Sequence, residues 1–129
     1  MSQEVLCEAT IDALRSRHPA YHETAYLFVL SGLHHTIDRL REPRHISGRE
    51  LAEGCRDLAL ERYGPLARSV LAFWGIRSTR DLGQVVFALV DCGILVKQPH
   101  DDVSDFEEIF DFDDLDHRYP WTIPSPLAP

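Results

Sequence analysis

Histidine is the residue type of this chain with the widest chemistry, since imidazole transfers protons near neutral pH and binds zinc. Seven histidines are present. His18 and His22 stand four residues apart, the separation of a zinc-binding pair on one helix, but Pro19 between them favours a helix that begins after His18. His34 and His35 are adjacent and therefore point to different sides of a helix. These spacings predict no metal site and no metal cofactor.

Nucleophilic catalysis has no recognisable signature in the sequence. It contains no G-x-S-x-G turn, no Ser-x-x-Lys pair, no glycine-rich phosphate loop and no CxxC pair. Cys7, Cys55 and Cys92 are odd in number and far apart, which is typical of reduced thiols in a cytosolic protein, and Cys55 and Cys92 are expected to be buried in helix cores. Ser47 and Ser78 each precede an acidic residue by three positions and are better explained as helix caps. We therefore expect no enzymatic activity and no cofactor.

Residues 77–98 are the clearest structural unit of the chain. Ser78 and Asp81 have the spacing of a helix N-terminus, and an apolar stripe of helical period follows, comprising Leu82, Val85, Val86, Leu89 and Val90. Gly93 suits the left-handed residue after a last helical turn, and residues 94–96 then favour a strand. A helix that turns directly into a strand, after earlier helices, indicates a winged helix.

Further helices are predicted upstream of this unit. Residues 3–17 form the first, Pro19 starts the second, and Ser47 opens a third that ends near Gly64. The second helix is apolar on more than one face and contains Gly32, so we expect it at the centre of the core, with another helix close to that glycine. A short helix over 66–74 is expected to turn four side chains inward: Leu66, Val70, Phe73 and Trp74.

The strands are expected to be short. His45–Ile46 forms one of them in this interpretation, and residues 106–112 return as the partner of 95–98, with the connecting segment as the wing. The predicted fold is therefore mainly α with a small β-hairpin: a winged-helix-like helical domain over residues 1–116. A proline-rich, flexible tail is expected at 117–129.

The charge of the chain is concentrated at one end. The formal net charge is −8, and residues 99–129 account for all of it, because residues 1–98 contain equal numbers of acidic and basic side chains. The N-terminal sequence lacks the pattern of a secretory signal, and the longest apolar run is far too short to span a bilayer. We expect a cytoplasmic protein that does not enter a membrane.

The leading functional hypothesis is a protein–protein interaction module. Acidic and aromatic residues alternate near the C-terminal end, a composition that can anchor in a partner's groove while its charge attracts a basic protein. The candidate interaction surface consists of Arg77, Arg80, Gln84, Phe87, Asp105, Glu107, Glu108, Asp111, Asp113, Asp114 and Trp121. Phe87 lies opposite the apolar stripe of its helix, so it is either exposed or covered by another segment, for which Trp121 is one choice.

Two other functions stay open. A winged-helix DNA-binding transcriptional regulator would present Arg77, Arg80 and Gln84 to base edges, but nucleic acid is disfavoured by charge, because phosphate neutralisation supplies most of the affinity for DNA. A metal-dependent enzyme would require His18, His22 and a carboxylate to meet at one metal point.

Five stretches carry a resemblance to known proteins: AYLFVL, SGREL, WGIRS, DLGQVVFALVDCGIL and, in an acidic context, FDF. In order and spacing these stretches resemble a family of small uncharacterised bacterial proteins, over roughly residues 20–116. The resemblance implies no established activity, and no catalytic residue is transferred by it.

Overall fold

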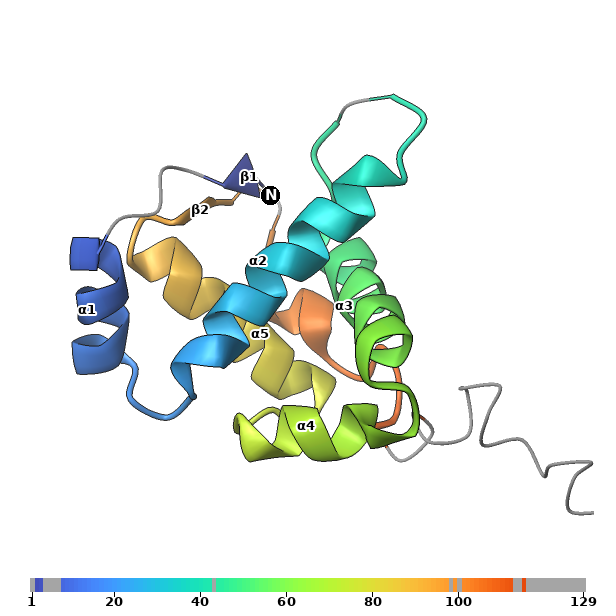
Figure 1. Ribbon diagram of the computed structural model, residues 1–129. Coiled ribbons are helices and arrows are strands. Elements are labelled where there is room, and N and C mark those ends of the chain that lie inside the picture. The colour runs from blue at the N-terminus through green and yellow to red at the C-terminus, as the bar shows by residue number, and fades with distance from the viewer. Residues whose placement is uncertain are drawn as a thin grey trace, which may run out of the picture.

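The computed structural model describes residues 2–3, 8–42, 44–97, 99, 101–112 and 115 (Figure 1). Its elements follow one another as β1 (Ser2–Gln3), α1 (Glu8–Arg17), α2 (Glu23–Asp38), α3 (Gly48–Tyr63), the 3₁₀ turn η1 (Gly64–Leu66), α4 (Ala67–Phe73), α5 (Thr79–Asp91), β2 (Leu95–Val96) and the 3₁₀ turn η2 (Val103–Phe106). The predicted mainly helical class is confirmed, whereas the winged-helix resemblance is not. The predicted tail at 117–129 lies outside the described residues.

Helix α2 forms the centre of the core and packs against both α3 and α5 (Figure 1). The crossing of α2 and α3 depends on two glycines. A Cβ atom built on Gly32 would collide with the Cys55 sulfur, and one built on Gly54 would collide with the Thr36 hydroxyl. The close approach predicted at Gly32 is therefore confirmed, and Gly54 provides its counterpart on α3.

The predicted helix caps are present. The Ser47 hydroxyl accepts from the Glu50 amide at 3.1 Å while the Glu50 carboxylate accepts from the Ser47 amide at 3.0 Å, which completes a capping box at α3. Ser78 caps α5 by accepting from the Asp81 amide at 3.2 Å. Gly93 has φ +78°, the left-handed conformation expected after the last turn of α5.

Helix α2 begins later than predicted. Pro19 lies in a turn, and α2 starts at Glu23 with His22 as its N-cap, where the imidazole Nδ1 accepts from the Thr24 amide at 3.1 Å. The backbone amide of His22 donates to the Trp74 carbonyl, which fixes the entry of the helix against the end of α4. Tertiary contact therefore places this helix start, which a local proline rule cannot do.

The prediction for α4 is confirmed for the buried Trp74 and wrong for Leu66 and Phe73. Leu66 and Phe73 are 63% and 78% exposed, while Ala67, Leu71 and Trp74 are buried. The reason is that η1 inserts a 3₁₀ turn before α4, so the buried positions 67, 71 and 74 follow a helical spacing that starts after Leu66.

The small sheet is antiparallel but has a different composition from the predicted hairpin. Ser2 pairs with Val96 and Gln3 with Leu95, so β2 takes its partner from the N-terminal segment. Residues 106–112 are not the returning strand: Phe106 ends the 3₁₀ turn η2, whose start is fixed by a capping box of the Asp102 and Asp105 carboxylates. His45–Ile46 is not a strand either, although Ile46 is buried.

No helix of the described part of the chain is both long and apolar enough to cross a bilayer.

Candidate functional site

A cleft of about 670 Å³ lies beside the N-terminal end of α5. One wall comes from residues 77–80 and the other from residues 107–112. The residues lining this cleft are Arg77, Ser78, Thr79, Arg80, Glu107, Glu108, Phe110, Asp111 and Phe112. Five of the predicted interaction residues therefore share one cleft: Arg77, Arg80, Glu107, Glu108 and Asp111.

The basic wall is held in place by the start of α5. The Asp81 carboxylate accepts from the Arg77 amide at 2.9 Å and from the Tyr21 hydroxyl at 3.1 Å. Burial, reinforced by the nearby Asp81 carboxylate, raises the pKa of Tyr21, so its hydroxyl stays a donor at neutral pH. Asp81 is thus committed to the backbone and to Tyr21, which leaves the exposed side chains of Arg77 and Arg80 to face the cleft.

The acidic wall is anchored by Phe106, the last residue of η2. This side chain is fully buried, and Cβ atoms built on Gly48 and Gly83 would lie only 2.8 and 2.7 Å from its atoms. The ring inserts between α3 and α5 because both helices carry glycine where it contacts them. The Thr79 hydroxyl also accepts from the Ile109 amide at 3.4 Å, which ties the two walls together.

Glu108 adopts φ +49°, the left-handed region that side chains other than glycine rarely enter. The residue nevertheless stays there because the segment is fixed before it by Phe106 and after it by the buried Phe112. The consequence is a sharp turn that places the exposed Glu107 and Glu108 side chains on the cleft.

Aromatic rings line the acidic side of the cleft. Phe110 and Phe112 stack with their centroids 5.3 Å apart and their planes 7° from parallel, and the Arg56 guanidinium lies 5.6 Å from the Phe110 centroid. Phe112 is buried and Phe110 is half-buried. These rings therefore support the wall as part of the core and leave the edge of Phe110 for a ligand.

The charges of Arg77, Arg80, Glu107 and Glu108 are not used in ion pairs between the described residues. Ion pairs within that part of the chain involve other residues, and the side chains of Arg77, Arg80, Glu107 and Glu108 form none of them. The two arginines and the two glutamates therefore face the same solvent-accessible cleft.

The other predicted surface residues have different roles or cannot be placed. Gln84 accepts from the Tyr21 hydroxyl at 2.7 Å, and Asp105 belongs to the η2 capping box. Phe87 is half-buried, and Phe106 covers it in an edge-on contact with centroids 6.1 Å apart. Asp113, Asp114 and Trp121 lie outside the described residues.

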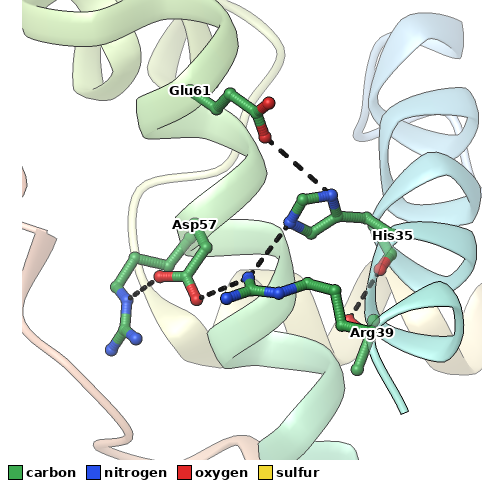
Figure 2. Close-up of polar contacts among 7 residues, drawn as sticks. His35, Arg39, Asp57 and Glu61 are labelled. Carbon is green, nitrogen blue, oxygen red and sulfur yellow. Dashed lines mark hydrogen bonds and ion pairs between the residues drawn. The ribbon is translucent and has the colours of Figure 1, made fainter. Parts of the chain in front are cut away.

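A second polar cluster spans the outer side of the α2–α3 crossing. Figure 2 shows His35 and Arg39 of α2 facing Asp57 and Glu61 of α3. The Arg39 guanidinium lies 3.5 Å from the Asp57 carboxylate, and His35 Nδ1 lies 3.9 Å from the Glu61 carboxylate. Arg39 Nη1 and His35 Nε2 are 3.3 Å apart. These groups pair with one another across the crossing, which indicates a structural role.

Two cysteines of the described chain are free thiols, as the sequence indicated. Cys55 is buried as predicted, and burial raises the pKa of its thiol to about 12. Cys92 was expected in a helix core but is only half-buried, because it caps the end of α5. It lies near His18 and Asp91, and these three residues form a group of potential metal ligands.

The sequence missed parts of both sites. Phe110 and Phe112 were expected on a returning strand, and the lining of the cleft by Ser78 and Thr79 has no local signal. His18 was considered only with His22, which instead caps α2. Its proximity to Asp91 and Cys92 depends on how α1 meets α5, which a spacing rule along one helix does not detect.

A scan against protein-family models finds no match for this chain, and searches of curated proteins and of solved structures find none either. The resemblance to a bacterial family therefore stays a prediction, and the functional argument depends on the geometry of the site.

Proposed function

We propose that this protein is a cytoplasmic interaction module, without enzymatic activity, that holds a basic segment of a partner protein in the cleft beside α5. The observation that carries the proposal is the pair of carboxylates at Glu107 and Glu108. Both side chains are exposed, both line the cleft, and neither is neutralised by an ion pair within the described residues.

The rigidity of the acidic wall supports binding. Phe106 and Phe112 fix residues 107–111 to the helical body, so little conformational freedom is lost when a ligand docks. The half-buried Phe110 offers apolar contact for the stem of an arginine or lysine side chain, whose charged end then reaches the carboxylates.

Arg77 and Arg80 on the opposite wall give the bound segment a direction. A partner segment that carries a basic residue at one end and an acidic residue at the other pairs with both walls at once. A segment with the reverse order meets like charges, which is a source of specificity.

The DNA-binding alternative receives less support from this arrangement. Arg77 and Arg80 share their cleft with Glu107, Glu108 and Asp111, so a duplex that approached α5 would meet carboxylates beside the arginines. Gln84, the proposed adenine reader, accepts a hydrogen bond from Tyr21.

The test is an amide chemical-shift titration of the full chain with short peptides as probes. One peptide carries arginines at its N-terminal end and glutamates at its C-terminal end. A second peptide has the reverse order, and a third contains glycine and serine only. We expect shifts confined to residues 77–80 and 107–112 with one charged peptide, and weaker binding of the other. The Glu107→Gln/Glu108→Gln double variant should weaken binding about tenfold, the sum of two exposed charge pairs.

Asp38→Asn/Glu42→Gln is the matched control, since both acids are exposed and lie outside the cleft. It should leave peptide affinity unchanged while removing the same charge. A duplex DNA titration serves as the competing probe. Shifts at Arg77 and Arg80 with DNA, abolished by Arg80→Ala and enhanced by the Glu107→Gln/Glu108→Gln variant, would favour the DNA-binding function and contradict the proposal.

A further inference from the structure

The C-terminal ends of α1 and α5 meet on a side of the molecule that the cleft does not use. His18 follows the last residue of α1, Asp91 ends α5, and Cys92 is the cap of α5. One potential ligand atom from each of these three residues lies within 4.8 Å of the other two. An imidazole nitrogen, a carboxylate oxygen and a sulfur thus converge from segments more than 70 residues apart.

We infer that His18, Asp91 and Cys92 form a binding site for a thiophilic divalent cation, with Zn²⁺ as the ion that fits best. Nitrogen, oxygen and thiolate sulfur are the three ligand types that zinc takes from proteins, whereas Mg²⁺ and Ca²⁺ select oxygen alone. Three protein ligands leave a fourth tetrahedral position for water. The bound metal would therefore be exchangeable or reactive, unlike the metal of a structural site with four protein ligands.

The distances fit such a site. His18 Nε2 lies 3.0 Å from Asp91 Oδ2. Ligand bonds of about 2.0–2.2 Å in a tetrahedron place neighbouring ligand atoms about 3.3–3.6 Å apart, so these two atoms already have nearly the separation of two zinc ligands. The wider limit of 4.8 Å for the group requires a movement of about 1 Å, which a rotation of the half-exposed Cys92 side chain supplies.

The backbone around the ligands is held in place. The His18 amide donates to the Leu14 carbonyl at 2.8 Å, and the His18 carbonyl accepts from the Tyr26 hydroxyl at 2.8 Å. On the other side, the Cys92 amide donates to the Ala88 carbonyl at 3.1 Å. The ligand-bearing residues therefore keep their positions whether or not a cation is bound.

The electrostatic field also favours a cation. Helix C-termini carry partial negative charge, and α1 and α5 both end here. Asp91 adds a full negative charge at a helix end where acids are ordinarily unfavourable. Arg17 lies 3.5 Å from this carboxylate but is exposed, so it can swing away when a metal binds. Binding releases the Cys92 thiol proton to solvent and leaves the thiolate on the metal.

The test is a Co²⁺ titration of the full chain under reducing conditions, because Co²⁺ replaces Zn²⁺ and reports its ligands in its absorption spectrum. A Cys7→Ser background removes the thiol that lies outside the described residues. We expect one equivalent to bind with a thiolate-to-cobalt charge-transfer band and tetrahedral d–d bands, and Zn²⁺ should displace it while Mg²⁺ and Ca²⁺ should not.

Variants assign the ligands. Cys92→Ser should abolish the charge-transfer band, while His18→Gln and Asp91→Asn should keep it and weaken affinity at least about tenfold, since even second-shell changes cost that much. His45→Gln is the control, because this histidine is exposed and does not belong to the group. Circular dichroism confirms that each variant is folded.

A second readout needs no variant. Zn²⁺ should slow alkylation of Cys92 measured by mass spectrometry, while the buried Cys55 stays unreactive with or without metal. Failure of Co²⁺ to bind, binding without a thiolate band, or unchanged affinity of His18→Gln would each overturn the inference. None of these outcomes affects the proposed peptide cleft, which contains none of the three ligands.

Discussion

At the crossing of α2 and α3, charged side chains pair with one another, whereas in the cleft beside α5 they face open space. Both regions depend on glycines that leave room for a close neighbour: Gly32 and Gly54 for the facing helix at the crossing, Gly48 and Gly83 for the Phe106 ring. At the crossing, Arg39, the C-cap of α2, lies 3.5 Å from Asp57 of α3 (Figure 2). In the cleft, Arg77 and Glu107 form no such pair within the described residues.

The pairing of charges distinguishes a region that serves packing from one that is available for recognition. The same device, a glycine that admits a bulky neighbour, supports both regions, so close packing by itself does not indicate a functional site. The distinguishing feature is what surrounds the packed contact. Charges that satisfy one another contribute to stability, and charges of both signs that are left on one rigid cleft are available to a ligand.

The largest expected effect is at the anchor of the cleft. Phe106→Ala should lower the free energy of unfolding by about 3–5 kcal/mol, because it empties a fully buried site between α3 and α5. Urea denaturation of both proteins measures the difference. A loss below about 1 kcal/mol would mean that residues 107–111 are not rigidly supported and would break the comparison.

The next effect concerns the crossing. Gly54→Ala should lower the free energy of unfolding by about 1–3 kcal/mol, because the new methyl group collides with the Thr36 hydroxyl. Helix propensity alone would favour alanine by about 1 kcal/mol, so the sign of the change shows which effect prevails.

Thr36→Ala supplies the control for this prediction. It removes the hydroxyl that meets the new methyl group, so the double variant should recover part of the loss, and the four proteins form a double-mutant cycle. Strict additivity of the two changes would indicate that the helices separate instead of colliding.

A smaller effect is expected from the start of α3. Hydrogen bonds from Arg44, with help from the capping amide of Ser47, lower the pKa of Glu50 to about 2 from an ordinary value of 4.5. The ionised form is therefore favoured by folding, and its contribution is present above pH 4.5 and lost as pH falls from about 4.5 towards 2.

Glu50→Gln should flatten the dependence of stability on pH within this window, measured by thermal unfolding at several pH values. Ser47→Ala removes the other half of the capping box and should cost about 1 kcal/mol at neutral pH. If the Glu50→Gln protein loses stability as steeply as the parent when the pH is lowered, other carboxylates determine the pH dependence of stability.

The smallest effects give the most direct test of the comparison. Asp57→Asn removes charge from the paired cluster and should lower the free energy of unfolding by about 0.2–1 kcal/mol. Glu108→Gln removes charge from the cleft. This variant should change the free energy of unfolding by less than about 0.5 kcal/mol and should weaken peptide binding. Equal losses of stability in the two variants would place Glu108 among the structural ion pairs.

Local sequence signals predicted the helices well but their contacts poorly. Ser47, Ser78 and Gly93 act within one helical turn, so the sequence alone located them. Leu66 and Phe73 were wrongly expected inside because a 3₁₀ turn moved the start of α4 from residue 66 to Ala67. The strand pairing of β1 with β2 joins two-residue segments more than 90 positions apart, and neither has a periodicity to detect.

Several individual residues of the cleft could be predicted from the sequence, but their assembly into one site could not. Arg77, Arg80, Glu107 and Glu108 were identified from their charge and their place in the chain. Their convergence required Phe106 to insert between α3 and α5, which ends η2 there and brings the acidic segment back to α5 as a turn instead of the expected strand. That insertion depends on Gly48 and Gly83, whose relation to one distant phenylalanine no local pattern reveals.

The pairing of Ser2 with Val96 determines when the N-terminal end acquires its structure during synthesis. Synthesis runs from the N-terminal to the C-terminal side, so β1 is made before β2 and has no partner until β2 follows. Closing so long a loop is slow compared with forming the helices between its ends. The α2–α3 crossing can therefore be complete while β1 is still unpaired, so β1 is made before these helices but is fixed after them.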